Sequence, residues 1–262
     1  MKIRNDEFDF SNKTYVMGIL NVTPDSFSDG GLHNTADKAV SHALKMIEDG
    51  ADIVDIGGES TRPGFEKVSE EEELKRVIPV IEALRKESEI PISIDTTKPA
   101  VAEAAMRAGA DIVNTVEGVN APAEMFDAVK KNDAFFVMTY ENSYVNLFPD
   151  ALVKMAEAAV ATGISRERII VDPGVGFGKT FEENLRIVNE LPLITQIQYP
   201  ILLGCSRKSM IGNVLNVPTD ERLSGTIVTT VLAGLAGVGI VRVHDVRENA
   251  QALKMLKSIC EV

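Results

Sequence analysis

The chain has 262 residues, 45% of them hydrophobic and 25% charged, a balance typical of a folded globular protein. Its net charge of −12 disfavours nucleic acid and anionic membranes as general partners, because both would repel a negative surface. The two cysteines, Cys205 and Cys260, do not have metal-ligand spacing, and the amino terminus is too acidic for a signal peptide. These features argue against a disulfide framework and a zinc site, and they predict a cytoplasmic protein.

Eight short apolar runs, rich in isoleucine and valine, are spaced along the chain. They show little alternation of polar and apolar residues, which is typical of parallel strands buried on both faces. The runs cover residues 15–20, 52–57, 91–95, 111–116, 135–139, 169–174, 200–206 and 239–246.

A helical pattern follows each run. The first covers residues 35–50, with Thr35 as the expected N-cap and Gly50 as the expected C-cap, and Ser69 with Glu72 fits a capping box for the second. Eight strand–helix units predict a closed (β/α)₈ barrel, the TIM barrel of the α/β class, formed as a single domain by residues 1–262. A doubly wound open sheet is the alternative.

One uncharged stretch between Arg222 and Arg242 is long enough to cross a membrane. Four glycines interrupt it, and serine and threonine are frequent. We therefore predict a buried helix, a glycine-containing turn and a buried strand, and no membrane partner.

Polar and charged side chains follow almost every predicted strand. TIM-barrel enzymes place their active sites at the carboxyl ends of the strands, so we expect these side chains to converge on one rim. The candidates are Asn21, Arg62, Asp95, Asn114, Asp172, Lys208, Arg242 and His244.

Two kinds of chemistry are represented at this rim. Arg242 and His244 are two residues apart on a strand and face the same way, and with Arg62 they offer donors suited to a phosphate or pyrophosphate. The second set suits the edge of a heterocycle such as a pyrimidinone, whose N–H and NH₂ groups need a carboxylate and whose carbonyl needs a donor. This set is Asp95, Asn114, Asp172 and Lys208.

Each of these residues also has a structural interpretation. Asp95 and Asp172 could cap the helices that follow them, and Lys208 could be a solvated loop charge.

The segment DPGVGFGKT, residues 172–180, ends like the phosphate-binding loop of an ATPase. That loop needs a glycine five residues before the Gly-Lys-Thr, where this chain has Pro173, and proline has no N–H to offer a phosphate. The segment therefore needs another explanation.

Five segments in order along the chain resemble the signature segments of the dihydropteroate synthase family. They are MGILNVTPDSFSDGG, DIGGESTRPG, DPGVGFGKT, SRKSMIG and VRVHDV. The resemblance covers nearly the whole chain. It implies a pterin-binding (β/α)₈ barrel that joins 6-hydroxymethyl-7,8-dihydropterin diphosphate to 4-aminobenzoate in folate biosynthesis and releases pyrophosphate.

The resemblance also assigns roles to individual residues. The pterin is expected at Asp95, Asn114, Asp172 and Lys208, with Phe177 as a wall. The diphosphate is expected at Arg62, Arg242 and His244 with Thr61 nearby, and 4-aminobenzoate at Lys208, Ser209, Thr61 and Pro63. Arg62, Lys208, Arg242 and His244 are the expected catalytic residues.

The resemblance implies three further properties. Asn21 is associated with a Mg²⁺ on the pyrophosphate, the enzyme is a homodimer, and sulfonamides act as mimics of 4-aminobenzoate. The family's substitution has SN1 character, so the protein must stabilise the departing diphosphate and align the arylamine.

Two segments depart from the family pattern. The family has Asn-Asp-(Ile/Val)-Ser-Gly at the fourth strand and Met-His-Met at the fifth, where this chain has NTVEG and MTYEN. The changes leave two alternatives to the synthase: a non-catalytic or altered-specificity pterin-binding paralogue, and a methyltetrahydrofolate–corrinoid methyltransferase. The second would need no diphosphate site.

Overall fold

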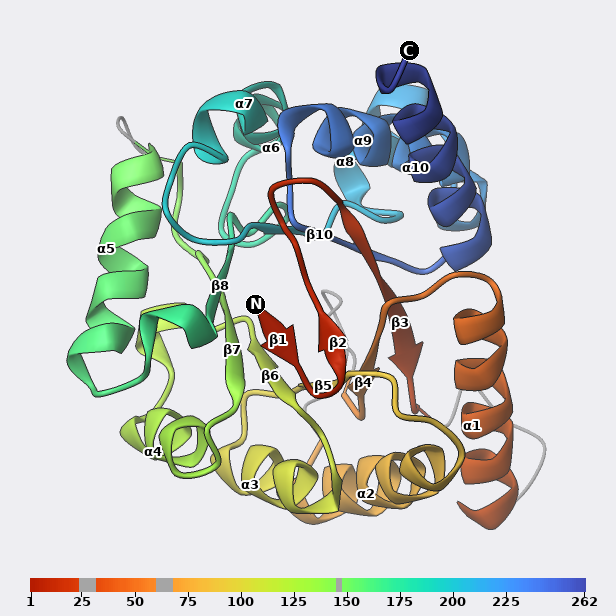
Figure 1. Ribbon diagram of the computed structural model, residues 1–262, viewed down its shortest axis with the longest axis vertical. Coiled ribbons are helices and arrows are strands. Elements are labelled where there is room, and N and C mark those ends of the chain that lie inside the picture. The colour runs from red at the N-terminus through yellow and green to blue at the C-terminus, as the bar shows by residue number, and fades with distance from the viewer. Residues whose placement is uncertain (24–31, 60–67, 145–147) are drawn as a thin grey trace.

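A closed barrel of parallel strands organises the chain (Figure 1). The computed structural model describes residues 1–23, 32–59, 68–144 and 148–262. Within these ranges the eight barrel strands follow the order β8-β7-β6-β5-β4-β3-β10-β9, and a parallel bridge between Val171 and Ile201 closes the ring. The predicted barrel is confirmed, and the open-sheet alternative is wrong. The strands are β3 (Tyr15–Asn21), β4 (Ile53–Gly57), β5 (Ile92–Asp95), β6 (Ile112–Thr115), β7 (Phe135–Thr139), β8 (Ile169–Asp172), β9 (Leu202–Leu203) and β10 (Ile240–Val243).

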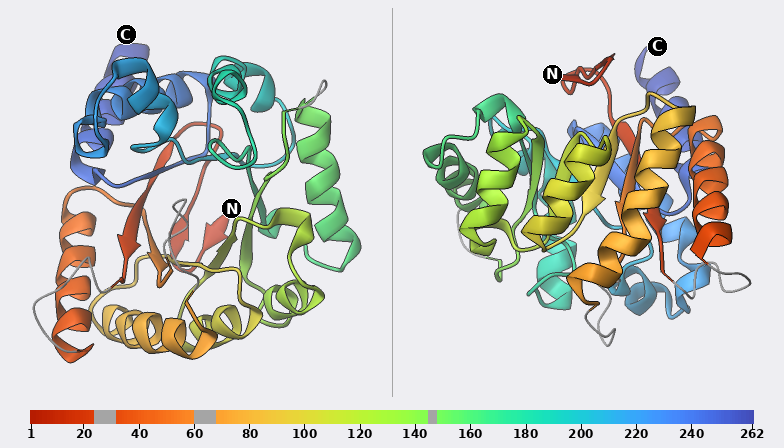
Figure 2. Two further views of the ribbon diagram at one scale, coloured as in Figure 1. Left: turned by 180° about the vertical axis from the view of Figure 1, so that it is seen from behind. Right: turned by 90° about the horizontal axis from the view of Figure 1, so that it is seen from below.

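Helices surround the strands on the outside of the barrel (Figures 1 and 2). At least one follows every barrel strand, as the sequence predicts. The α-helices within the described residues are α1 (Leu32–Glu48), α2 (Glu70–Glu87), α3 (Pro99–Ala108), α4 (Ala123–Lys131), α5 (Phe148–Ala161), α6 (Phe181–Asn189), α7 (Leu191–Ile194), α8 (Ser209–Leu215), α9 (Leu223–Ala236) and α10 (Val246–Cys260). Short 3₁₀ turns occur at η2 (Gly118–Asn120), η3 (Arg166–Arg168) and η4 (Thr219–Glu221).

The ends of several elements differ from their predicted positions. Helix α1 begins at Leu32, so Thr35 lies inside the helix and is not its N-cap. Gly50 does end the helix, with a φ of 105° and an N–H that donates to Ile47. The Ser69 hydroxyl caps α2 by accepting the Glu72 N–H at 3.2 Å. Strand β9 is only two residues long.

The uncharged stretch forms α9 and β10, joined by a turn in which Gly237 has a φ of 79°. This confirms the predicted helix, turn and strand. Across the described ranges, no helix combines the length and the apolar character needed to cross a membrane.

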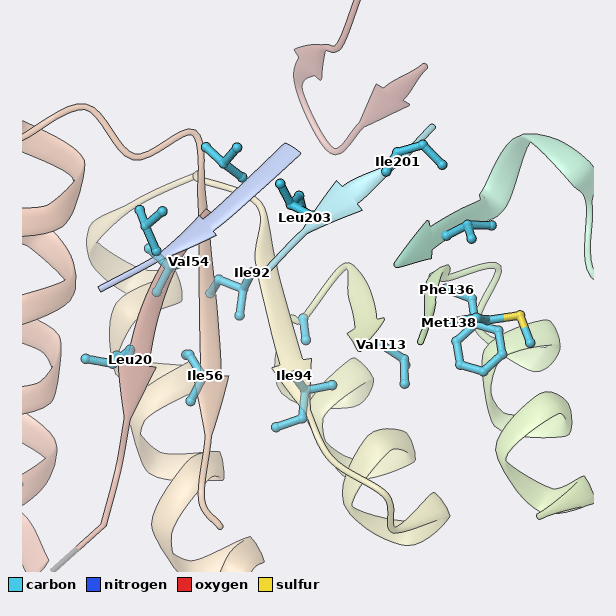
Figure 3. Packing of buried hydrophobic residues seen from close by; sticks show 14 of the residues in the cluster. Leu20, Val54, Ile56, Ile92, Ile94, Val113, Phe136, Met138, Ile201 and Leu203 are labelled. Atoms are coloured by element: carbon cyan, nitrogen blue, oxygen red, sulfur yellow. The ribbon is translucent and has the colours of Figure 1, made fainter. Parts of the chain in front are cut away.

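The apolar core has two parts, because side chains alternate across each strand. Outward-facing residues such as Ile56, Ile94 and Phe136 pack between the strands and the helices (Figure 3). Inward-facing residues fill the end of the barrel at which the strands begin. An unpredicted hairpin, β1 (Lys2–Ile3) and β2 (Asp6–Glu7), lies across this end and adds Ile3 and Phe8 to the inner cluster (Figure 2).

Candidate active site

The inside of the barrel changes from apolar to polar along each strand. Residues two apart on a strand share a face. Each inward apolar residue near the start of a strand is therefore followed, two residues later, by another inward residue. The step from Ile53, Ile112, Ile170 and Ile240 leads to Asp55, Asn114, Asp172 and Arg242. The strands therefore bring these polar side chains together toward their carboxyl ends, where the catalytic rim is predicted.

Arg242 occupies the middle of this polar layer. Its Nε donates to Asp55 Oδ2 at 2.5 Å, and its Nη2 donates to Asp95 Oδ2 at 2.5 Å. Asn114 joins the group, with Nδ2 at 3.3 Å from Asp55 Oδ2. Two carboxylates thus share one largely buried guanidinium.

Burial raises the pKa of Asp95 to about 7, although the neighbouring Arg242 opposes this rise. Burial also acts to lower the pKa of Arg242, but the charges of Asp55 and Asp95 outweigh it and raise that pKa. Asp95 can therefore exchange a proton near neutral pH while Arg242 stays charged.

Asp55 is a residue that the sequence analysis missed. It lies within an apolar strand, where an acidic residue has no obvious role. Its side chain is fully buried and contacts both Arg242 and Asn114. The alternation of side chains along the strand IVDIG could have revealed it, because this alternation places Asp55 on the same face as Ile53.

Asp172, which is buried, and Lys208, which is partly buried, form the second group. Burial raises the pKa of Asp172 and lowers that of Lys208, and in each case the opposite charge of the other works against the shift. Between them lies Gly204, where a Cβ atom would be 3.6 Å from Asp172 Oδ2 and 3.9 Å from Lys208 Nζ. Lys208 Nζ also donates to the Val175 carbonyl and lies 4.4 Å from the centroid of the Phe177 ring.

The loop DPGVGFGKT owes its glycines to backbone geometry. Gly174 and Gly178 have φ values of 74° and 60°, and a Cβ atom on either would lie 2.1 or 2.0 Å from a carbonyl oxygen of the loop after β7. Lys179 locks the two loops together by donating to the Tyr140 carbonyl at 2.6 Å and the Phe177 carbonyl at 2.9 Å. Burial lowers its pKa to about 8.

Helix caps do not account for the two aspartates. Thr180 caps α6 in a capping box with Glu183, and α3 begins at Pro99 after Lys98. Asp172 instead accepts the Gly174 N–H at 2.7 Å within its own loop. Lys208 is partly buried and donates to the Val175 carbonyl, so it is not a solvated loop charge. The structural interpretations of these residues are therefore wrong.

His244 and Ser209 follow the neighbouring strands β10 and β9. His244 follows β10, and its Nδ1 is 3.0 Å from the Ser206 hydroxyl, which follows β9. Ser209 is the first residue of α8, directly after Lys208. Asn21 is the last residue of β3. It lies four residues after the inward-facing Met17, so it faces inward as well. Thr61, Arg62 and Pro63 lie outside the described residues.

The two departures from the family pattern are close to this site. Thr139 is buried on the inward face of β7 and pairs in register with Asp172. Tyr140 turns away and packs edge-on against Phe148, with ring centroids 5.2 Å apart. A pocket of about 280 Å³ opens beside them, and Glu117 and Glu141 contribute to its lining. Asn114 keeps its place among the inward residues.

The pterin-binding enzyme family model matches residues 17–244. The dihydropteroate synthase of Clostridium beijerinckii is 50% identical over 97% of this chain and 97% of its own. The chain belongs to the dihydropteroate synthase family. This is the family that the five sequence segments resemble.

Solved structures of other family members have the same fold. The dihydropteroate synthase of Clostridium difficile, solved in the presence of pteroic acid, aligns with a TM-score of 0.91 and 49% identity, covering 97% of this chain and 99% of its own. The synthase of Yersinia pestis, solved as a complex with a sulfonamide drug, aligns with a TM-score of 0.91 and 38% identity over 100% of this chain and 99% of its own.

Membership of the family gives the chain its activity. It is a transferase of folate biosynthesis that moves a dihydropterinyl-methyl group to an arylamine. The relatives favour the synthase over the methyltransferase and over a non-catalytic paralogue.

Proposed function

We propose that residues 1–262 act as one pterin-binding barrel domain that condenses 6-hydroxymethyl-7,8-dihydropterin diphosphate with 4-aminobenzoate at the carboxyl rim. The products are 7,8-dihydropteroate and pyrophosphate. The observation that carries this proposal is the polar group inside the barrel, in which Asp172 Oδ2 and Lys208 Nζ lie 3.6 and 3.9 Å from the Cβ position of Gly204. Burying charge costs free energy, and a ligand that hydrogen-bonds to both side chains offsets part of this cost.

The pterin is assigned to the region around Asp172. A carboxylate there can accept the ring N–H and the NH₂ group, and Lys208 can donate to the ring carbonyl. Asn114 and Asp95 supply further donors and acceptors from the neighbouring strands β6 and β5. Phe177, held against Lys208, provides an apolar wall.

The diphosphate is assigned to Arg242 and His244, with Arg62 and Thr61 from the adjacent segment. An arginine carries five N–H donors, and the bonds of Arg242 to Asp55 and Asp95 use two of them. These donors are most valuable as charge develops on the departing diphosphate, because they are already oriented. The arylamine is assigned to Lys208, Ser209, Thr61 and Pro63.

Asn21 fits a role in holding Mg²⁺ on the diphosphate. Its side-chain oxygen is a hard ligand, and Mg²⁺ in such sites takes one or two protein oxygens together with substrate phosphates. A cage made only of protein is not needed, and no cluster of three or more His, Cys, Asp or Glu residues suited to a metal occurs in the part of the chain that the structure describes. When bound, the ion would offset the charge of the leaving group.

A homodimer is the assembly that we assign to this enzyme. Helix α9 exposes Val228, Leu232 and Leu235 along one face, and the adjacent α10 exposes Met255 and Ile259. An apolar patch of this kind marks an interaction surface. Sedimentation of the wild type and of Leu235→Lys would test it, with a dimer expected only for the wild type. The free thiols of Cys205 and Cys260 suit the cytoplasm, where we place the enzyme.

The reaction is tested by measuring pyrophosphate release with and without 4-aminobenzoate. We expect release to depend on the dihydropterin diphosphate and to rise sharply when the arylamine is added. The same protein should bind the diphosphate more tightly than free hydroxymethylpterin. Equal affinity for both, without pyrophosphate release, would contradict the proposal.

A further inference from the structure

Ser206 and His244 meet where β9 and β10 end. The Ser206 hydroxyl oxygen lies 3.0 Å from His244 Nδ1, and it accepts the backbone N–H of His244 at 3.1 Å. Ser206 is buried, with 6% of its surface exposed. The serine therefore holds both the backbone and the ring of the histidine from one atom.

The geometry limits which ring nitrogen of His244 carries the proton. A backbone N–H can only donate, so the hydroxyl must accept there, and its own hydrogen is left for another acceptor. Among the contacts of the described residues, the only acceptor within reach of that hydrogen is His244 Nδ1. If Nδ1 were protonated, the hydroxyl hydrogen would be buried without a partner, which is unfavourable.

We propose that Ser206 is a positioning residue that keeps His244 in the tautomer with its proton on Nε2. The hydrogen bond at one ring nitrogen decides the protonation of the other. His244 then offers its Nε2–H to the departing diphosphate. The other tautomer would present a lone pair to an anion. This inference rests on the proposed role of His244 in binding the diphosphate, but the tautomer can be measured without it.

The tautomer itself is tested by nitrogen NMR of the imidazole rings in the ligand-free wild type. The chain has only three histidines, so the signals can be assigned with single His→Gln variants at His33, His42 and His244. We expect His244 to show a protonated Nε2 and an unprotonated Nδ1 without averaging between them. A protonated Nδ1, or an averaged pair, would overturn the proposal whether or not any variant folds.

The consequence for the ligand is tested with magnesium pyrophosphate and calorimetry. Ser206→Ala should weaken its binding about tenfold, the scale of one hydrogen bond to a charged group. Ser206→Thr keeps the hydroxyl and should restore most of the affinity. The kcat should fall more than KM rises in Ser206→Ala, because the donor matters most when the leaving group gains charge.

A double-mutant cycle separates this role from a general effect on structure. His244→Gln places an amide donor near the position of Nε2 and has no tautomer to fix. In that background Ser206→Ala should change pyrophosphate affinity less than twofold. An equal loss in both backgrounds would show that Ser206 acts elsewhere. If the wild-type tautomer is as expected but His244→Ala binds pyrophosphate normally, the proposed role of His244 fails and the tautomer assignment stands.

Discussion

The two ends of the barrel use buried charge in different ways. At the end where the strands begin, Arg85 donates to Asp111 at 2.8 Å and to the carbonyls of Gly109, Ser88 and Ile90. Asp111 also accepts the Ile92 N–H at 2.9 Å. At the opposite end, Asp55 and Asp95 share the single guanidinium of Arg242.

The difference indicates which end is built for stability and which for a ligand. At the end where the strands begin, hydrogen bonds from Arg85 and Asp111 to other protein groups offset the cost of removing these charges from water. The hairpin is tied to the same network by Arg4, whose Nη1 donates to Asp111 Oδ1 at 3.4 Å. At the top, carboxylates outnumber the guanidinium between them, so the arrangement is less stable until a ligand adds donors.

Removing Arg242 should have the largest effect on this comparison. Arg242→Ala leaves Asp55 and Asp95 buried without their cation, so we expect a loss of about 3–5 kcal/mol in the free energy of unfolding at pH 8. Binding of the diphosphate substrate should fall by about 2–4 kcal/mol more than binding of free hydroxymethylpterin. Urea unfolding and calorimetry measure the two effects. Equal losses for both ligands would remove Arg242 from the diphosphate site.

Asp172→Asn should affect the ligand and leave the fold nearly unchanged. The substitution keeps the shape but turns one acceptor toward the pterin N–H into a donor. We expect pterin affinity to fall by about 3 kcal/mol, on the order of a hundredfold, because a buried polar mismatch remains. Glu183→Gln, in the capping box of the following helix, is the matched control and should bind pterin normally. Near-normal affinity in Asp172→Asn would mean that Asp172 serves only its own loop.

The sequence predicted the barrel and much of the candidate site because both depend on local patterns. Runs of isoleucine and valine marked the strands, and polar residues after each run marked the rim, as at Asp95 and Asp172. The hairpin was missed because its strands have two residues each and are held by contacts distant in the chain, such as Arg4 with Glu89. No local pattern encodes such contacts.

Partners across the barrel were the second feature that the sequence could not predict. The pairing of Arg242 with Asp55 joins residues 187 positions apart, and it depends on the register of β3, β4 and β10. The same holds for Gly174 and Gly178 of DPGVGFGKT. In the structure they admit carbonyls of a neighbouring loop, which no single segment reveals.

Arg85→Met should show the opposite behaviour to Asp172→Asn. Asp111 would lose its closest cation and three carbonyls would lose a donor, so we expect the free energy of unfolding to fall by about 2–4 kcal/mol. The kcat/KM of the folded enzyme should stay within about twofold, because the site lies at the other end of the strands. Arg107→Met, which removes an exposed pair with Glu103, is the control and should cost at most about 0.5 kcal/mol. A large fall in kcat/KM for Arg85→Met would show that the two ends are coupled.

The pH dependence of stability offers the most specific test. Burial raises the pKa of Asp95 from 3.8 to about 7, so the folded protein holds this proton more tightly than the unfolded chain. The stabilisation from the protonated carboxyl is therefore complete below about pH 4 and is lost as the pH rises to about 7, at up to about 1.4 kcal/mol per pH unit. Asp95→Asn cannot titrate, so its stability relative to the wild type should improve across this range.

The measurement is urea unfolding of both proteins from pH 4 to 8. Since the pKa of Asp172 is also raised, the difference between the two proteins is the relevant quantity. Parallel curves would mean that Arg242 keeps Asp95 ionised throughout, and that the top of the barrel balances its charges as fully as the bottom does.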